Sequence, residues 1–485
     1  MNRGLDLRPI ILVTGILVTT LGVAMILPAV VDLAAGNPDW RVFLASSMLT
    51  SLVGFSLFMA ARGTPRGLST RQALLMTVVS WVALVSFGAL PFMWSGIVDG
   101  YTDAFFESMS GLTTTGATVI VDLDVAPPGI LFWRGLLQWL GGLGIIVMAI
   151  AVLPMLQIGG LQLFKAEAFD TAGKILPKAA QISSSITLVF IAFTVICCAL
   201  FAAAGMPIGD AVIHSMTTVA TGGFSTKDLS IGYFQSAAID WITIVFMILG
   251  SIPFVLYVQT LQGRLRPILT DSQVHVFLGT VATATIIAWL MAHFGEFHVG
   301  LEGLRYAAFN VVSILTGTGY ATTDYGIWGP HATSFFFVIM FIGGCAGSTS
   351  CGIKIFRFQV VFEAIRQHIN QVMYPHGVFR PKFNGRPIEM AVIASVMSFL
   401  FLYINSFGVI AAALLMTGLD TTTALSGAGS AISNVGPGLG RVIGPAGNYA
   451  PLNDTAKWIL SAGMLLGRLE LFTILVLFLP RFWRN

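Results

Sequence analysis

Charged residues are scarce in this sequence. Asp, Glu, Lys and Arg make up 10% of its 485 residues, whereas hydrophobic residues make up 56% and the mean hydropathy is +0.85. A chain of this composition cannot cover a globular surface with polar side chains, so a water-soluble protein is excluded and an integral membrane protein is expected. The net charge of +3 is small and spread over several loops, which argues against nucleic-acid binding.

Cysteine and catalytic motifs are sparse as well. Cys197 and Cys198 share one apolar run, and Cys345 and Cys351 flank a glycine-rich segment, so the four cysteines do not have the spacing of a disulfide framework. The sequence contains no P-loop, no paired metal ligands and no nucleophile with a base at a usable spacing. We therefore expect no enzymatic activity and no cofactor bound by this chain. A nucleotide would have to bind to another chain.

Long apolar runs are abundant and define the fold class. Runs of roughly 20 residues, long enough to span a bilayer as helices, occur near residues 9–34, 40–61, 72–97, 130–158, 183–205, 236–262, 272–294, 332–370, 388–417 and 455–482. The first run is longer than a signal-peptide core and lacks a small-residue cleavage site, so we expect it to be retained as a transmembrane helix. The sequence predicts an all-α polytopic membrane protein.

Four shorter segments, near 101–114, 209–219, 301–315 and 420–432, lie between pairs of these runs. A segment of about 10–14 residues is too short to span a bilayer, which favours re-entrant helices. If the N-terminus is inside, most of the 25 Lys and Arg residues, among them Lys165, Lys174 and Lys178, fall on the inner side. Because these residues accumulate in cytoplasmic loops, we expect both termini in the cytoplasm and the short segments entering from outside.

The short segments and the residues that follow them are copies of one another. Four segments align without gaps: "ESMSGLTTTGAT" (107–118), "HSMTTVATGGFS" (214–225), "NVVSILTGTGYA" (310–321) and "GAGSAISNVGPG" (427–438). One column of this alignment holds Gly116, Gly223, Gly319 and Gly436. We call this the glycine column. It predicts four units of helix, pore loop and helix around a central pore, at 67–165, 166–268, 269–380 and 381–485, behind two additional N-terminal helices at 1–66.

The glycine loops are candidates for an ion path. Irregular backbone at membrane depth is tolerated when it is buried in protein or lines a water-filled cavity. Glycine permits backbone angles that turn carbonyl oxygens inward, and a ring of carbonyls can replace the hydration shell of a monovalent cation. One "TGTGY" (316–320) could be an interhelical turn, but four aligned copies favour a filter. Its expected residues are Thr114, Thr115, Gly116, Thr221, Gly222, Gly223, Gly317, Thr318, Gly319, Asn434, Val435 and Gly436.

A second glycine-rich stretch, "GGCAGSTSCGIK" (343–354), interrupts the run 332–370. Its small residues weaken a helix through low propensity and through side chains that compete for backbone hydrogen bonds. We expect a broken helix there, the alternative being a seam of small residues packed on a neighbouring helix. The residues concerned are Gly343, Gly344, Gly347, Ser348, Thr349, Ser350 and Gly352, with Lys354 directly after them.

Two charged residues inside apolar surroundings also need explanation. Arg468 lies near the centre of the run 455–482, where a charge costs about 2.5–3.5 kcal/mol and normally faces a partner or a water-filled path. A buried ion pair is the alternative, although Glu470 is placed on another face of a helix. Glu107 in the first short segment could attract cations or be a satisfied buried carboxyl. His214 and Asn310 share its column.

These motifs resemble the Trk/Ktr/HKT superfamily of potassium transporters over essentially the whole chain. The carriers of the resemblance are the four loops, "GGCAGSTSCGIK" and "GRLE" (467–470), and the two extra N-terminal helices make the chain most similar to the membrane subunit of bacterial Trk systems. The resemblance implies a filter at the glycine column, a gate at 343–354, where Cys351 replaces a common glycine, and a barrier to cations at Arg468. It implies a homodimer that binds a TrkA-type cytosolic nucleotide-binding ring.

The expected function is translocation of potassium and rubidium across the bacterial inner membrane. Coupling of this uptake to protons or sodium stays open, and an organic-solute transporter is a weaker alternative, since its repeats should be fewer and larger. The stretch 354–388 holds six basic residues and few acidic ones, so it could contact lipid headgroups or the soluble partner.

Overall fold

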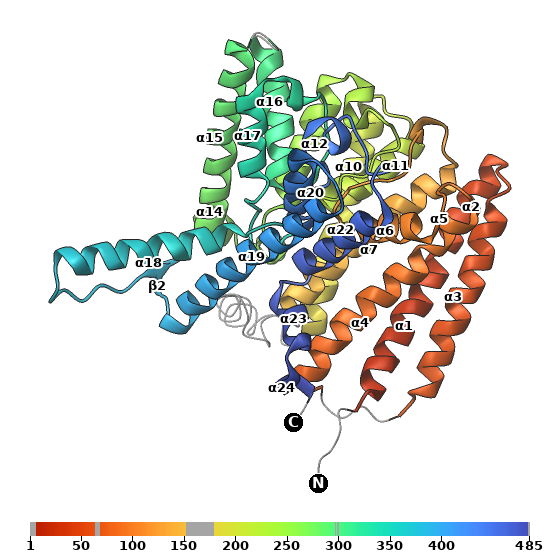
Figure 1. Ribbon diagram of the computed structural model, residues 1–485, viewed down its shortest axis with the longest axis horizontal. Coiled ribbons are helices and arrows are strands. Elements are labelled where there is room, and N and C mark those ends of the chain that lie inside the picture. Colours follow the sequence, from red (N-terminus) through yellow and green to blue (C-terminus); the bar gives the residue numbers. More distant parts are fainter. Residues whose placement is uncertain (1–5, 64–67, 152–178, 296, 298–299, 484–485) are drawn as a thin grey trace.

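The computed structural model describes residues 6–63, 68–151, 179–295, 297 and 300–483. Lys165, Lys174 and Lys178, the boundary expected at 165/166 and the end of the run 130–158 lie outside the described residues. Within them, helices form almost the whole molecule, and the two termini lie at the same end (Figure 1). The all-α fold predicted from the apolar runs is confirmed.

Two N-terminal spans precede the repeats. They consist of α1 (Arg8–Ala24), α2 (Ile26–Ala35) and α3 (Trp40–Ala60). A Cβ on Gly15 would lie 2.6 Å from the backbone nitrogen of Phe58, and one on Gly54 would lie 2.5 Å from that of Thr19. Helices associate in lipid through such small residues, because they let the backbones approach closely. The close packing of α1 on α3 thus requires glycine at both positions.

The remaining elements are given in the order of the four repeats expected from the sequence. The first repeat contains α4 (Thr70–Gly88), α5 (Leu90–Trp94), α6 (Tyr101–Leu112), η1 (Leu123–Val125) and α7 (Pro128–Ala151). The second contains α10 (Ala179–Ala203), α11 (Ile208–Val219), η2 (Ser230–Phe234), α12 (Ala237–Gly250) and α13 (Phe254–Leu261), followed by α14 (Arg266–Thr270).

The third repeat contains α15 (Ser272–Phe294), α16 (Gly300–Leu315), η3 (Tyr325–Ile327), α17 (Pro330–Ile339) and α18 (Ile355–Met373), and the hairpin of β1 (Lys382–Phe383) and β2 (Arg386–Pro387) follows beyond its expected end at 380. The fourth contains α19 (Met390–Met416), α20 (Thr421–Ser433), α21 (Gly440–Ile443), α22 (Asp454–Arg468), α23 (Phe472–Leu475), η4 (Val476–Phe478) and α24 (Pro480–Trp483). The short helices α6, α11, α16 and α20 agree with the predicted segments to within two residues.

Fewer continuous spans form than the sequence predicts. Seven described helices are long and apolar enough to cross a membrane, or nine if two bent pairs each count as one span. The run 236–262 bends by 92° between α12 and α13, where Pro253 has no N–H to continue the helix. The run 455–482 bends by 108° after Arg468, with Glu470 and Leu471 at positive φ in the break. Neither run is the straight helix expected.

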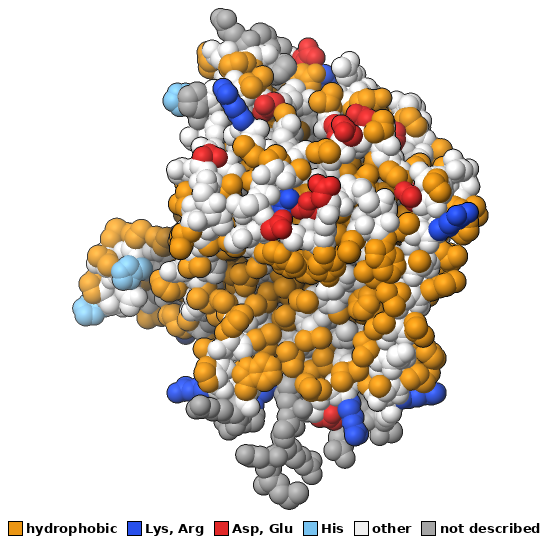
Figure 2. Space-filling view, turned by 45° about the vertical axis from the view of Figure 1, so that its right-hand side comes forward, with side chains coloured by type: hydrophobic (Ala, Val, Ile, Leu, Met, Phe, Trp, Pro, Cys, Tyr) orange, Lys and Arg blue, Asp and Glu red, His pale blue; other side chains and the backbone are white. Residues whose placement is uncertain are grey.

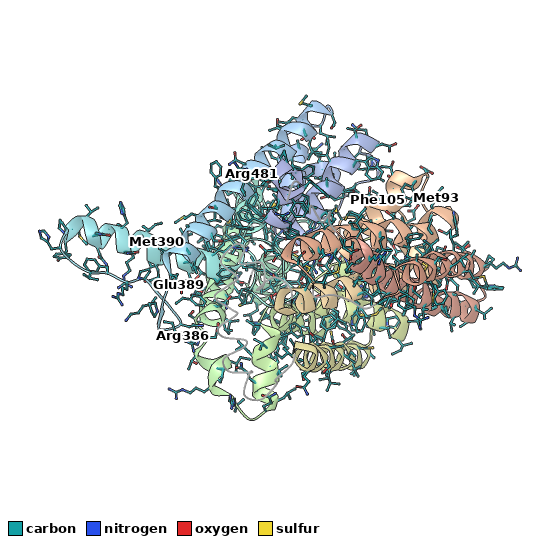
Figure 3. The ribbon with its side chains drawn as sticks, turned by 90° about the horizontal axis from the view of Figure 1, so that it is seen from below. Met93, Phe105, Arg386, Glu389, Met390 and Arg481 are labelled. Carbon is teal, nitrogen blue, oxygen red and sulfur yellow. The ribbon has the colours of Figure 1, made fainter. Side chains whose placement is uncertain are left out.

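The run 332–370 is also not one span. α17 ends at Ile339, an irregular loop follows, and α18 then extends sideways out of the bundle (Figure 1). The break predicted at the glycine-rich stretch is thus observed. α18 and the β1–β2 hairpin form an arm that projects sideways, with Arg386 and Glu389 near its base when seen from below (Figure 3). The hairpin turns at Asn384 and Gly385, both at positive φ, as in type I′ turns.

The surface matches a membrane environment. Figure 2 shows a broad band of hydrophobic side chains around the visible face, with most acidic side chains above the band and Lys and Arg side chains along its lower end. That lower end also carries both chain termini (Figure 1). A multi-pass protein is expected to show such an apolar band where it meets the bilayer.

Candidate functional site

The loops after the four short helices meet one another. A Cβ on Gly116 of the first loop would collide with the carbonyl oxygen of Gly222 in the second. A Cβ on Gly223 of the second loop would collide with the carbonyl oxygen of Thr318 in the third. Glycine is therefore required at both column positions, because the neighbouring backbone occupies the space of a side chain.

Similar backbone contacts join the third loop to the fourth and the fourth loop to the first. A Cβ on Gly319 would collide with the carbonyl oxygen of Val435 in the fourth loop. One on Gly436 would lie 2.7 Å from the carbonyl oxygen of Thr115 in the first loop. The glycine column that the sequence aligned is thus a closed ring of four backbones in space.

The four loops also share one backbone conformation. Each short helix ends in a Schellman motif, in which the N–H before the column glycine bonds to the carbonyl five residues earlier, at 2.8–3.0 Å: Thr115 to Ser110, Gly222 to Thr217, Thr318 to Ser313 and Val435 to Ser430. Two positions before each column glycine, the backbone has a φ of 48–75°, at Thr114, Thr221, Gly317 and Asn434. The column glycines themselves have φ of 81–100°. This repeated pattern brings four helix C-termini, the negative ends of their dipoles, to one ring.

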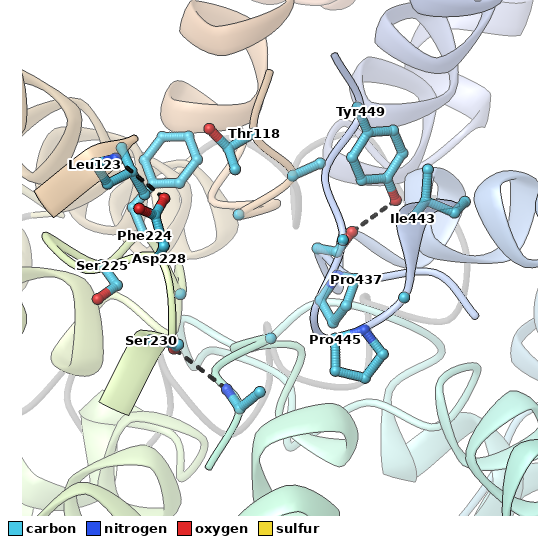
Figure 4. A pocket seen from close by; sticks show the side chains of 18 of the residues that line it. Thr118, Leu123, Phe224, Ser225, Asp228, Ser230, Pro437, Ile443, Pro445 and Tyr449 are labelled. Atoms are coloured by element: carbon cyan, nitrogen blue, oxygen red, sulfur yellow. Dashed lines mark hydrogen bonds between the residues drawn. The ribbon is translucent and has the colours of Figure 1, made fainter. Parts of the chain in front are cut away.

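A cavity of about 80 Å³ lies against the ring and is lined by all four column glycines. Thr118, Phe224 and Pro437 also line it, together with Tyr449 (Figure 4). A water molecule needs about 10–15 Å³ on this measure, so the cavity can hold several waters or an ion. Among the described residues, no group of three or more His, Cys, Asp or Glu side chains could hold a metal ion.

Backbone carbonyl oxygens of the ring differ in whether they accept a hydrogen bond from a described residue. No described residue donates a hydrogen bond to the carbonyl oxygens of Thr115, Thr318 or Val435. The fourth member of that set, Gly222, accepts one from Nε2 of Gln138 at 2.5 Å. Since buried carbonyls in proteins are nearly always paired, the three others can serve a cation or water.

Side chains of the short helices hold the segments that leave the ring. The carboxylate of Glu107 accepts hydrogen bonds from the hydroxyl of Thr118 and from the backbone N–H of Val119. His214 lies 2.9 Å from the hydroxyl of Ser225, in the same place one repeat later. Asn310 donates to the Thr322 hydroxyl at 3.1 Å. The column that begins with Glu107 is therefore a set of structural clamps.

Glu107 is a satisfied buried carboxyl rather than a free cation attractor. Nε of Arg134 on α7 lies 2.7 Å from Glu107, and both side chains are almost fully buried. Arg134 also donates to the carbonyl oxygen of Ser225 at 2.7 Å, and its guanidinium lies 4.1 Å from the Phe224 ring centre. This pair joins the first two loops, and the sequence motifs did not reveal it.

The fourth repeat is built differently, because Gly427 occupies the clamp position. There the hydroxyl of Tyr449 donates to the carbonyl oxygen of Gly436 at 2.7 Å (Figure 4). The backbone N–H of Tyr449 donates to the carbonyl oxygen of Thr118 at 2.8 Å. Tyr449 therefore ties the fourth loop to the first, a role that no sequence signal indicated.

The glycine-rich loop between α17 and α18 lies directly under the ring. Oγ of Ser350 donates to the carbonyl oxygen of Thr316 at 2.6 Å. Oγ1 of Thr349 donates to the carbonyl oxygen of Gly250 at 2.8 Å and accepts from the hydroxyl of Thr221 at 3.2 Å. The loop is thus bonded to the second and third loops of the ring and to the end of α12.

Glycines fit the loop into this space. A Cβ on Gly343 would collide with the carbonyl oxygen of Cys351, and Gly344 is confined between two serine side chains. Gly347 and Gly352 have φ of 77° and 72°, which non-glycine residues rarely adopt. The alternative of a packing seam between two helices does not describe this stretch, because no helix runs through residues 343–354, all of which are described.

Polar groups hold the loop to itself and border a second cavity. Oγ of Ser348 donates to the carbonyl oxygen of Cys345 at 2.6 Å, and Nζ of Lys354 donates to that of Ser350. A cavity of about 40 Å³ lined by Ser350, Lys354 and Arg468 lies below. Among the described residues, it shares no lining residue with the cavity at the ring.

Arg468 lies at the end of α22 and not in the middle of a helix, which corrects the sequence-based placement. Its guanidinium is buried and donates to the carbonyl oxygens of Thr349 at 3.3 Å and Gly141 at 3.1 Å. Nη1 also contacts Sγ of Cys351. In the part of the chain that the structure describes, no carboxylate lies within ion-pair distance of Arg468. The ion-pair alternative is therefore not observed.

Glu470 instead pairs with Arg357 of α18, at 2.5 Å. The guanidinium of Arg357 is buried and lies 3.6 Å from the ring centre of Phe399 on α19. This contact fixes the bend after α22 to the base of the arm. No role for Glu470 was expected from the sequence, because a straight helix would have pointed it elsewhere.

Comparisons with known proteins agree with this geometry. A family model for TrkH, described as a cation transport protein, matches residues 40–485. The Trk system potassium uptake protein TrkI of Halomonas elongata is 40% identical over 98% of this chain and 97% of its own length. The TrkH protein of Salmonella typhimurium is 39% identical over 99% of both chains.

A solved structure resembles the chain over nearly its full length. The crystal structure of the potassium transporter TrkH from Vibrio parahaemolyticus superposes with a TM-score of 0.91 at 34% identity, covering 99% of this chain and 100% of that one. The family expected from the motifs is thus confirmed. This chain belongs to the TrkH family of cation transport proteins.

Proposed function

We propose that the chain moves potassium, and with it rubidium, across the bacterial inner membrane through the ring of four loops. The observation that carries this proposal is the closed contact between the four column glycines. The proposed filter consists of Thr114, Thr115, Gly116, Thr221, Gly222, Gly223, Gly317, Thr318, Gly319, Asn434, Val435 and Gly436. Potassium is the transported ion, held by backbone carbonyl oxygens.

The chemistry of the ring supports a monovalent cation. Calcium sites are built largely from carboxylates, and the nearby carboxylate of Glu107 is already bonded to Arg134. Carbonyl dipoles and four helix C-termini attract a positive charge without binding it too tightly to leave. The names of the relatives, which are potassium uptake proteins, favour potassium over sodium.

A gate below the filter is the second part of the proposal. It consists of Gly343, Gly344, Gly347, Ser348, Thr349, Ser350, Gly352, Lys354 and Arg468. The hydrogen bonds of Ser350 and Thr349 to the filter loops support an occluded path in this conformation. Arg468 adds a fixed positive charge at the same level, which raises the energy of a passing cation.

Orientation and partners complete the proposal. The end that carries both termini and the basic side chains faces the cytoplasm, as the positive-inside rule favours. The arm exposes Phe362, Ile369 and Val372 at 65%, 52% and 69%, an apolar surface suited to a second copy of the chain. The basic stretch 354–388 is the proposed contact for a TrkA-type nucleotide-binding ring.

Flux measurements test the proposal. Proteoliposomes that contain the purified chain, with and without a TrkA-type subunit, are loaded with potassium. They should take up radioactive rubidium, driven by the outward potassium gradient, faster than protein-free vesicles. Excess external potassium should compete with the rubidium and sodium should compete less. Rubidium uptake equal to that of empty vesicles in both conditions, or uptake of labelled amino acids instead, would contradict it.

A further inference from the structure

A large apolar cavity of about 490 Å³ lies away from the ring, between α1, α4 and α7. Its walls come from residues 13–21, 76–84 and 140–148 of these helices, with Leu112 at the end of α6. Each of the three stretches rises about 12 Å along its helix. The cavity is therefore a slot parallel to the membrane-spanning helices.

The lining leaves few polar groups for a ligand. The three hydroxyl side chains among its described residues are already engaged: Thr20 donates to the carbonyl oxygen of Ile16 at 2.9 Å, Thr77 to that of Ala73 at 2.9 Å, and Ser80 bonds to Thr14 at 2.9 Å. None of the described lining residues is charged. Water enters a cavity when it finds two to four polar partners, so this slot suits an apolar occupant.

The slot is open to the bilayer. Leu17 of α1 is 38% exposed, and Thr20 and Gly144, which also line the slot, are exposed as well. The slot begins about 9 Å along α4 from Thr70, on the side of the chain termini. It therefore meets the hydrocarbon of the leaflet at that side, which supplies the occupant.

We propose that this slot binds one acyl chain of a bilayer phospholipid. Its volume lies in the range of about 300–1,000 Å³ found for small-molecule sites. Its length and its continuity with the lipid-facing surface fit a linear chain that enters sideways from the membrane.

One wall of the slot also supports the proposed permeation path. Gly141 lines the slot, and its carbonyl oxygen accepts the hydrogen bond from Nη2 of Arg468 at 3.1 Å. A Cβ on Gly141 would collide with the carbonyl oxygen of Leu112, so α7 lies directly on the end of α6. An acyl chain in the slot packs behind this contact and holds α7 in place.

Quenching of Trp81, whose side chain lines the slot, tests the site. Bromine atoms on an acyl chain quench a tryptophan that they touch. The protein is reconstituted in phospholipid with brominated acyl chains, and the signal of Trp81→Phe is subtracted to remove the other tryptophans. A second set of samples contains ordinary phospholipid with a brominated free fatty acid.

Two matched variants separate the slot from the general lipid surface. Gly144 lines the slot, and a Cβ at this position would meet no described atom within 4 Å, so Gly144→Phe fills the slot without a backbone clash. Gly279 of α15 is equally unobstructed but lies outside the slot, so Gly279→Phe is the control. Native mass spectrometry counts the phospholipid retained by each protein.

We expect Trp81-dependent quenching by brominated phospholipid in the wild type and in Gly279→Phe, and its loss in Gly144→Phe together with loss of one retained phospholipid per chain. Absence of that quenching in the wild type would overturn the proposal. Equal quenching in Gly144→Phe, or quenching by the free fatty acid alone, would do so too. None of these readouts depends on ion transport.

Discussion

The guanidinium of Arg468 donates a hydrogen bond to the carbonyl oxygen of Thr349 at 3.3 Å, across 119 residues of sequence. Thr349 in turn bonds to Thr221 in the second loop of the ring. A buried positive charge is therefore held on the loop beneath the ring by carbonyl groups. Arg468 is therefore not half of an ion pair among the described residues.

Removing that charge should raise flux. Arg468→Ala deletes a fixed positive charge near the proposed path, and it strands no carboxylate among the described residues, because Glu470 is paired with Arg357. The lost hydrogen bonds should lower the free energy of unfolding by about 1–3 kcal/mol. We expect folded protein in detergent and faster rubidium flux per molecule in proteoliposomes.

Arg468→Lys is the matched control, since it keeps the charge and should stay closer to the wild-type flux. An Arg468→Ala protein that is strongly destabilised and shows no gain in flux per folded molecule would sink the barrier interpretation.

Shortening the loop tests the gate separately. Deleting residues 347–350 removes the hydrogen bonds of Thr349 and Ser350 to the filter loops, so rubidium flux without the cytosolic partner should rise. Dependence of flux on a TrkA-type subunit should fall at the same time. If a well-folded deletion protein keeps wild-type flux, the loop is a packing element and not a gate.

Glu107 should matter for folding more than for ion choice. Glu107→Gln leaves the buried Arg134 without its charge partner, which costs about 3–5 kcal/mol. We expect a lower unfolding temperature in detergent with an unchanged ratio of rubidium to sodium uptake. The double variant Glu107→Gln with Arg134→Met removes both charges and should recover part of the stability. A changed ion ratio in a stable Glu107→Gln protein would give Glu107 a direct role in permeation.

The sequence predicted those parts of the structure that repeat. Four aligned copies revealed the glycine column, because a backbone contact that excludes every side chain leaves the same residue at Gly116, Gly223, Gly319 and Gly436. The length of the segments between the long apolar runs predicted the short helices equally well. The contact of Gln138 with the ring could also have been suspected from the sequence, because Gln138 is a polar residue one turn after Arg134 in an apolar run.

Contacts between distant segments could not be predicted in this way. Tyr449 bonds to Gly436 and Thr118 from the segment between α21 and α22. The 108° bend after Arg468 lies inside a hydrophobic run whose sequence predicts a straight helix. The pairing of Glu470 with Arg357 depends on that bend, so a helical projection, which correctly pointed Glu470 away from Arg468, could not identify Arg357 as its partner.

Close backbone contact makes Gly141 intolerant of substitution. Gly141→Ala would place a Cβ on the carbonyl oxygen of Leu112 and push α7 away from the filter loop. Gly144→Ala, one turn later, meets no described atom within 4 Å and should change stability by less than about 1 kcal/mol. Unfolding temperatures and folded yields of the two variants measure the difference. Equal values would show that α6 and α7 are not in close contact.

The glycine ring is the central claim, and Gly319→Ala tests it most directly. This substitution introduces a Cβ that collides with the carbonyl oxygen of Val435, at a φ of 84° that disfavours any side chain. Gly418→Ala is the control, because Gly418 has a φ of 90° but no described atom within 4 Å of the added Cβ. It carries similar backbone strain outside the ring.

The decisive measurement is the ratio of rubidium to sodium uptake by proteoliposomes that contain wild type, Gly319→Ala or Gly418→Ala. A loss of about 1.4 kcal/mol in differential binding lowers this ratio roughly tenfold. We predict such a fall for Gly319→Ala and a wild-type ratio for Gly418→Ala. A wild-type ratio in folded Gly319→Ala protein would contradict a filter built on the glycine ring.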